Sequence, residues 1–221
     1  AELYTSSQNP THDLLGHAPK FSQTNGKIKI GYFSSDFNNH AVASLIAEVF
    51  ELHDKSKFEI IGFSYGADDN SHIRSRLIHS FDQFVDIRNL SNLEAATLAR
   101  NMKINIAIDL NGLTQNSRTG IFSYRAAPLQ INYLGYPGTT GANYIDYVIA
   151  DNIIIPKKSQ SFYTEKVAYL PFCYQPNDRK RAIGKRSWSK KELGLPENYL
   201  IFCCFNNNFK ILPNIFDIWM Q

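Results

Sequence analysis

The 221-residue sequence is poor in cysteine and has no long apolar run. Its three cysteines cannot all pair, and the adjacent Cys203 and Cys204 suit neither a mutual disulfide nor a spaced metal site. No segment approaches the run of about 18 apolar residues that spans a bilayer. Residues 1–25 also lack the basic start and apolar stretch of a signal peptide. These absences predict a reducing compartment, and we expect a soluble, cytoplasmic chain with no membrane partner.

An excess of one charge is also missing, since the formal net charge is +3. This balance permits attraction to an anion such as a diphosphate, but it falls short of the dense basic surface of a nucleic-acid binder. The basic stretch from Arg179 to Lys191 has a single aromatic residue, too few for the interleaved aromatic residues of a single-strand groove. We therefore expect no nucleic-acid partner.

Two common site motifs are absent as well. The sequence contains no GxxxxGK[ST] and no GxGxxG, which disfavours the P-loop and dinucleotide-binding classes. His53, His72 and His79 have no second ligand at a convincing spacing, so we predict no metal and no cofactor. We favour group transfer in a cleft between two domains.

Apolar runs of strand length alternate with amphipathic, helix-length segments along most of the chain. This alternation predicts an α/β, Rossmann-like parallel sheet with helices on both faces. The expected strands are 27–34, 58–64, 83–86, 104–110, 129–133, 147–150 and 166–170. The expected helices are a segment ending near Leu52, 71–79 and 92–102.

Polar or glycine-rich loops follow three of these strands, at Ser34 to His40, Asp109 to Gln115 and Leu134 to Gly141. The last loop, LGYPGTTG, has three glycines and a proline, a composition that leaves backbone N–H groups bare for a ligand. In parallel sheets ligands bind beyond the carboxyl ends of the strands. We therefore expect the three loops to form one site, of a kind that suits a nucleotide sugar.

Individual side chains in these loops leave two interpretations open. His40, with Asp36 four residues earlier, could accept a proton from an alcohol, or it could simply cap a helix. Asn111 and Thr114 suit hydrogen bonds to a sugar, but the same residues form local turns. Lys210, before a helix, could meet a diphosphate or remain solvated.

Composition shifts divide the chain into four parts. A single strand at Tyr199 to Phe205 and a helix opening near Pro213 cannot bury a core of their own, so we expect the last part to be incomplete. The parts are a polar N-terminal linker at 1–26, the main domain at 27–172, a basic linker at 173–192, and the start of a second domain at 193–221.

Several long stretches together closely resemble the O-GlcNAc transferase/SPINDLY family, especially its bacterial members. They are GYFSSDFNNH (31–40), the run 109–151, FYTEKVAYLP (162–171), CYQPNDRKR (173–181) and FCCFNNNFKI (202–211). The resemblance implies an inverting GT-B glycosyltransferase, with two Rossmann-like domains, that moves a sugar from UDP-GlcNAc to protein Ser or Thr hydroxyls without a metal. It also implies tetratricopeptide repeats upstream. The chain would then hold the acceptor-side domain and the start of the donor domain.

The resemblance assigns roles to residues of this sequence. His40 matches an active-site histidine proposed as a base, and Lys210 and Asn207 match contacts to the diphosphate and nucleotide. Positions around the sugar and acceptor match Asn111, Thr114, Leu134, Gly135 and Pro137. Ser44 and Leu113 stand where the family commonly has histidine, so we expect a shifted acceptor or donor preference. Transfer of fucose from GDP-fucose, and a non-catalytic interaction module, stay open as alternatives.

Overall fold

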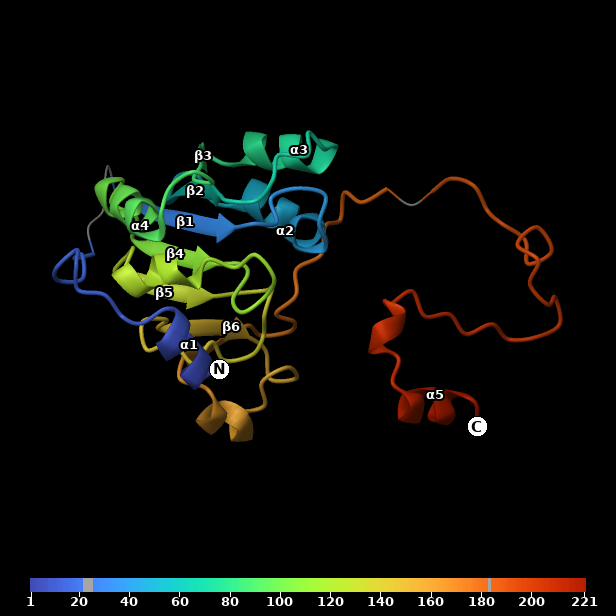
Figure 1. The fold of residues 1–221 in the computed structure, drawn as a ribbon. Helices are drawn as coiled ribbons and strands as arrows, with labels where there is room; N and C mark the ends of the chain where they lie inside the picture. Colours follow the sequence, from blue (N-terminus) through green and yellow to red (C-terminus); the bar gives the residue numbers. More distant parts are fainter. Residues whose placement is uncertain (22–25, 183) are drawn as a thin grey trace. The chain divides into compact units, whose positions relative to one another are not determined.

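The computed structural model describes residues 1–21, 26–182 and 184–221. Two compact units divide the chain, an N-terminal unit at Ala1–Arg181 and a C-terminal unit at Ala182–Gln221. Within the described residues, the N-terminal unit is built on a seven-stranded sheet of order β3-β2-β1-β4-β5-β6-β7 (Figure 1). Every neighbouring pair is parallel. The predicted Rossmann-like α/β class is confirmed.

The strands lie where the apolar runs predict them. Helices cover both faces of the sheet, so the central strands are near-continuous apolar runs rather than alternating ones. The observed bounds are β1 Ile28–Ser34, β2 Phe58–Ser64, β3 Gln83–Asp86, β4 Ile106–Asp109, β5 Leu129–Asn132, β6 Tyr147–Ala150 and β7 Lys166–Tyr169.

Two pairs of helical segments form the two outer layers. The helices α2 (Ala41–Leu52) and α3 (His72–Ser80) pack on one face of the sheet, with Phe50 at the centre of that core. The helix α4 (Asn92–Asn101) and the 3₁₀ helix η1 (Thr119–Tyr124) pack on the other. Three fully buried alanines on α4, which let it approach the sheet closely, are Ala95, Ala96 and Ala99.

We expected the polar N-terminal residues to form a linker, but their described part packs against the main domain. A short helix, α1 (Glu2–Gln8), buries Thr5, whose hydroxyl donates to Thr140 O at 2.6 Å. Further along, Asn9 O accepts from the Tyr144 hydroxyl at 3.1 Å. The sequence did not predict this helix because no hydrophobic period marks it. It is held by hydrogen bonds to residues far along the chain.

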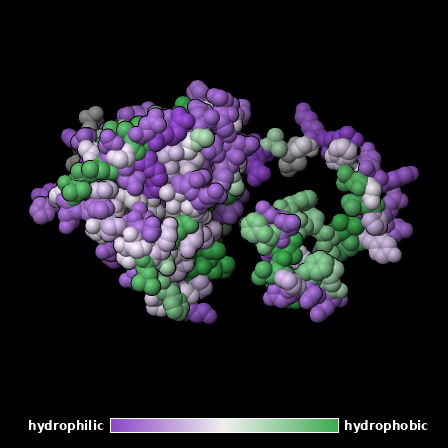
Figure 2. Space-filling model, in the orientation of Figure 1, coloured by the Kyte–Doolittle hydropathy of each residue, from purple (hydrophilic) through white to green (hydrophobic). Residues whose placement is uncertain are grey.

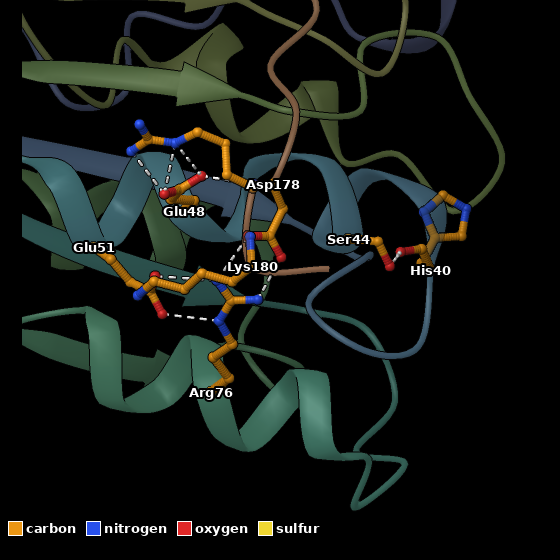
Figure 3. A network of polar contacts seen from close by, with 8 residues as sticks. His40, Ser44, Glu48, Glu51, Arg76, Asp178 and Lys180 are labelled. Carbon is orange, nitrogen blue, oxygen red and sulfur yellow. Dashed lines mark hydrogen bonds and ion pairs between the residues drawn. The ribbon is translucent and has the colours of Figure 1, made fainter. Parts of the chain in front are cut away.

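Part of the expected basic linker forms a strap along the domain surface, which we define as residues 178–180. Arg179 pairs with Glu48 of α2 at 2.9 Å, and Lys180 pairs with Glu51 at 2.7 Å (Figure 3). Asp178 and Glu51 both bind the guanidinium of Arg76 on α3. Hydrogen bonding to Arg76 lowers the pKa of Glu51 to about 2. These charges, expected to be solvated, instead fix the end of the N-terminal unit to α2 and α3.

The predicted strand at Tyr199 to Phe205 is wrong. The segment forms no strand, and Phe202 and Phe205 are 89% and 96% exposed. A strand needs a neighbour for its backbone hydrogen bonds, and among the described residues of this unit the segment has none. Figure 2 accordingly shows apolar side chains on the surface of the C-terminal unit.

Helical structure in the C-terminal unit follows the prediction more closely. The 3₁₀ helix η3 (Asn208–Lys210) precedes α5 (Pro213–Trp219), which opens on a proline as expected. A third 3₁₀ segment, η2 (Lys157–Phe162), lies in the N-terminal unit and was not predicted. Across the described parts of the chain, no helix combines the length and apolar character that crossing a membrane requires.

Candidate functional site

A cavity of about 570 Å³ opens beyond the carboxyl ends of β1, β2, β4 and β5. Strand order reverses between β1 and β4, which is the position where open parallel sheets bind ligands. The cavity brings together one predicted site residue from each of the three predicted loops: His40, Thr114 and Gly135. Its other lining residues include Ser35, Asp36, Asn38, Val42, Tyr65, Gly66, Ala67, Gln115 and Asn116.

Asn111 lies fully buried behind the cavity wall, where it joins the loops after β1, β2 and β4. Its Oδ1 accepts from Ser34 Oγ at 3.1 Å, from Ser35 N at 3.0 Å and from the Tyr65 hydroxyl at 2.9 Å. Burial, followed by nearby carboxylates, raises the pKa of Tyr65, so this hydroxyl stays a donor. Asn111 therefore organises the rim, and its predicted contact with a sugar stays a prediction.

The amide nitrogen of Asn111 extends the same network toward the cavity. Its Nδ2 donates to Asp36 Oδ2 at 3.0 Å and lies 3.3 Å from Thr114 Oγ1. The Thr114 hydroxyl donates back to Asn111 O at 3.0 Å, so the local turn that we held open as an alternative is present. Thr114 also lines the cavity, and its role toward a sugar stays a prediction.

His40 both caps a helix and faces the cavity. Its Nδ1 accepts from Val42 N at 3.2 Å at the start of α2, and it lies 3.5 Å from Asp36 Oδ2. The side chain is 48% exposed and lines the cavity. Ser44, one turn into α2, donates to His40 O at 3.1 Å (Figure 3). Capping therefore occupies one ring nitrogen, and the predicted role of His40 as a base stays a prediction.

Asp109, at the end of β4, is a fully buried carboxyl beneath this network. Its Oδ1 accepts from Asn111 N at 2.9 Å, while Oδ2 has no hydrogen-bond partner in the described part of the chain. Burial raises the pKa of Asp109 to about 7, and the charge of Asp36 contributes to the rise. A carboxyl in this position is therefore partly protonated near neutral pH.

The glycine-rich loop is more rigid than its composition suggests. The amides of Gly135, Thr140 and Gly141 donate to Tyr133 O, Glu165 Oε1 and Thr139 Oγ1. For these positions the expectation of bare N–H groups is wrong. Each amide is satisfied within the protein, as buried backbone generally is.

Three predicted site residues of this loop differ in their exposure to the cavity. Gly135 lines it and has no room for a side-chain carbon, because Leu110 O lies against it. Leu134 is 7% exposed and has a φ of 72°, a left-handed conformation that is uncommon for a bulky residue. Pro137 O accepts from the Tyr163 hydroxyl at 2.9 Å. The contacts of all three with a sugar stay predictions.

Two contributions to this rim were missed by our sequence analysis. Tyr65 and Gly66 follow β2, and the same rule about carboxyl ends of strands would have found them. Gly66 touches Ser35 O and leaves no room for a side chain. Glu165, which accepts from both Thr139 and Thr140, has no local signal in the sequence.

Asn207 and Lys210 belong to the C-terminal unit. Both are exposed, Asn207 preceding η3 and Lys210 ending it. Their predicted contacts with the nucleotide and diphosphate stay predictions. In the described ranges, no three His, Cys, Asp or Glu side chains form a group that could hold a metal ion.

An all-parallel sheet with a polar cavity at its reversal of strand order defines a Rossmann-like α/β unit of the ligand-binding kind. The sequence profile of glycosyl transferase family 41 matches residues 9–187. The chain therefore belongs to glycosyl transferase family 41, a family of O-GlcNAc transferase and SPINDLY proteins, as its motifs predict.

Similar proteins come from plants, animals and bacteria. The chain is 38% identical, over 87% of its length, to a probable UDP-N-acetylglucosamine–peptide N-acetylglucosaminyltransferase SEC of Arabidopsis thaliana. It is 37% identical, over 76%, to the corresponding transferase of Caenorhabditis elegans. The chain spans 20% of the length of the Arabidopsis protein and 15% of the length of the Caenorhabditis protein. A solved structure of a mutant O-GlcNAc transferase from Thermobaculum terrenum is also similar, with a TM-score of 0.66 and 30% sequence identity. The match covers 68% of the present chain and 29% of the Thermobaculum chain.

Proposed function

We propose that the chain forms the acceptor-side half of a protein O-GlcNAc transferase, and that the whole protein moves GlcNAc from UDP-GlcNAc to Ser or Thr hydroxyls. Membership of family 41 and the names of the relatives support the substrate class. A protein or peptide is then the second substrate. Tetratricopeptide repeats upstream would recruit it, as the resemblance implies.

The observation that carries the proposal is the half-exposed His40 ring in the cavity at the reversal of strand order. In the proposed step the acceptor hydroxyl oxygen attacks C1 of the sugar. The bond from C1 to the diphosphate oxygen breaks, its electron pair leaves with UDP, and the configuration at C1 inverts. The hydroxyl proton passes to Nε2 of His40, the ring nitrogen outside the helix cap, when that nitrogen carries no proton of its own.

The leaving diphosphate gathers negative charge as the bond breaks. We assign the neutralisation of this charge to Lys210, with Asn207 contacting the nucleotide, in a donor domain that the whole protein completes. A fixed cation near a leaving anion stabilises the transition state without reorganisation. No metal enters this mechanism.

Replacing His40 tests the proposal, and asparagine is the informative replacement. An asparagine side chain at this position would still accept from Val42 N, because asparagine is a preferred cap, but it cannot take a proton. In the whole protein, with UDP-GlcNAc and a peptide acceptor, we expect His40→Asn to lower kcat by about 10²–10⁴-fold. Unchanged turnover would refute the role of His40 as a base.

His79→Asn serves as the matched control, since His79 is an exposed helix residue that hydrogen-bonds Ser75 O outside the cavity. It should leave turnover unchanged. Running the same assay with GDP-fucose distinguishes the donor: faster transfer of fucose than of GlcNAc would contradict the proposed donor. For the chain alone, calorimetry with UDP should show weak binding at best, because one wall of a cleft is present.

A further inference from the structure

The His40 ring has two competing partners on the same nitrogen. Val42 N lies 3.2 Å from Nδ1 and can only donate to it, while the Asp36 carboxylate lies 3.5 Å away and can only accept from it. One nitrogen cannot accept from the first and donate to the second at the same time. The ring therefore has two alternative bonding states at this position.

The choice between these states determines what Nε2 can do. When Nδ1 accepts from Val42, the proton of a neutral ring is on Nε2, which can then only donate. When Nδ1 carries the proton and donates it to Asp36, Nε2 has a free lone pair. Only the second state can remove a proton from a hydroxyl in the cavity.

Asp36 is fixed firmly enough to influence this choice. Its Oδ1 accepts from Ser35 Oγ at 2.8 Å, its Oδ2 accepts from Asn111 Nδ2 at 3.0 Å, and its side chain is 16% exposed. Asn111 is itself held by the loops after β1 and β2. The Asp36 carboxylate is thus mostly buried and held in place by hydrogen bonds, and it is the charged group that faces the His40 ring at Nδ1.

We propose that Asp36 is a positioning residue that draws the His40 proton to Nδ1, against the competing amide of Val42, and so leaves Nε2 free to accept the proton of the acceptor hydroxyl. This inference rests on the proposed function for its consequence, but its first step concerns the ring alone. The network around Asn111 then has a purpose at the site, since it holds the carboxylate that selects the tautomer.

Nitrogen-15 NMR of the chain reports which ring nitrogen of His40 carries the proton, at a pH above the titration of the imidazole. His40→Asn identifies the signal among the six histidines. Asp36→Asn replaces an acceptor with an amide that can donate to Nδ1, so we expect the proton to move toward Nε2. Asp69→Asn is the matched control: Asp69, in the loop after β2, accepts from Asn39 N beside His40 and has no hydrogen bond to the ring in the described part of the chain. It should leave the tautomer unchanged.

A second variant moves the equilibrium the other way. Val42→Pro removes the competing N–H from the first turn of α2, where backbone N–H groups have no partner within the helix. We expect a larger share of protonated Nδ1. Shifts of opposite sign in the two variants support the inference, whereas identical tautomers in all proteins, or shifts of reversed sign, overturn it.

Kinetics of the whole protein connect the tautomer to the reaction. Asp36→Asn should lower kcat at least about tenfold with little change in KM, and it should have no further effect in a His40→Asn background. A tautomer shift with unchanged kcat would overturn the positioning role. Absence of transfer by the unaltered protein would refute the proposed function alone, because the NMR result does not depend on activity.

Discussion

Two segments that the sequence predicts as strands behave differently in this chain. Leu129–Asn132 forms β5, bonded to β4 on one side and to β6 on the other, whereas the run from Tyr199 to Phe205 is exposed and forms no strand. Both precede a polar or glycine-rich loop. The difference shows that an apolar run becomes a strand when neighbouring strands satisfy its backbone, which the N-terminal unit provides for β5.

The largest expected effect contrasts one phenylalanine from each unit. Phe33 is fully buried, with its ring stacked on Phe63 at 4.3 Å between centroids, so Phe33→Ala should cost about 3–5 kcal/mol of stability. Phe202 is 89% exposed, and Phe202→Ala should change stability by less than about 0.5 kcal/mol. Urea unfolding followed by circular dichroism measures both. A comparable loss for Phe202→Ala would show that the C-terminal unit has a core of its own.

Local sequence patterns were sufficient for the elements but not for the contacts between them. The strand Phe58–Ser64 was predicted with its observed bounds because seven consecutive residues carry the signal. The bonds between Asn111 and Asp36, between Glu165 and Thr140, and between Arg179 and Glu48 join residues 75, 25 and 131 positions apart. No local period encodes such a pair, so these partners become visible only once the sheet places them.

For the candidate site, too, the sequence predicted which loops come together but not the contacts between their side chains. Strand order and the rule about carboxyl ends brought the loops of His40, Thr114 and Gly135 together. The rule could not indicate that Asn111 is buried and fully bonded, because that depends on side chains from two other loops. It also could not show that Glu165 accepts a hydrogen bond from the Thr140 amide, one of the N–H groups that the loop was expected to offer to a ligand.

A buried carboxyl gives the N-terminal unit a pH dependence that the exposed C-terminal unit should lack. The pKa of Asp109 is about 7 in the folded protein and 3.8 as its ordinary value. Between these values the folded chain binds more protons than the unfolded one, so the free energy of unfolding falls as pH rises from about 4 to 7. The loss should reach about 1–4 kcal/mol by pH 8.

Asp109→Asn removes this titration and keeps an acceptor for Asn111 N. Urea unfolding at pH 5 and pH 8 should therefore show a smaller pH-dependent loss in the variant than in the unaltered chain. Equal losses in the two proteins would show that Asp109 ionises in the folded state without penalty. Asp86→Asn, at an exposed ion pair on the end of β3, is the control.

The smallest expected effect concerns the boundary between the units, which follows Arg181, just after the strap. Arg179 N and its guanidinium both bind Glu48, so a protease that needs an extended, unpaired arginine should cleave slowly there. Limited trypsin digestion should favour Lys185 and Arg186. Glu48→Gln removes the ion pair and should speed cleavage after Arg179 several-fold, a modest change because ion pairs at the surface are weakened by solvent.

Glu197→Gln, an exposed glutamate in the C-terminal unit, provides the matched control for this digestion. Mass spectrometry of the fragments distinguishes the outcomes. Cleavage after Arg179 as fast as cleavage after Lys185 in all three proteins would place the boundary before the strap and not after it. Selective cleavage in Glu48→Gln would instead establish that α2, the helix that His40 caps, also fixes where the N-terminal unit ends.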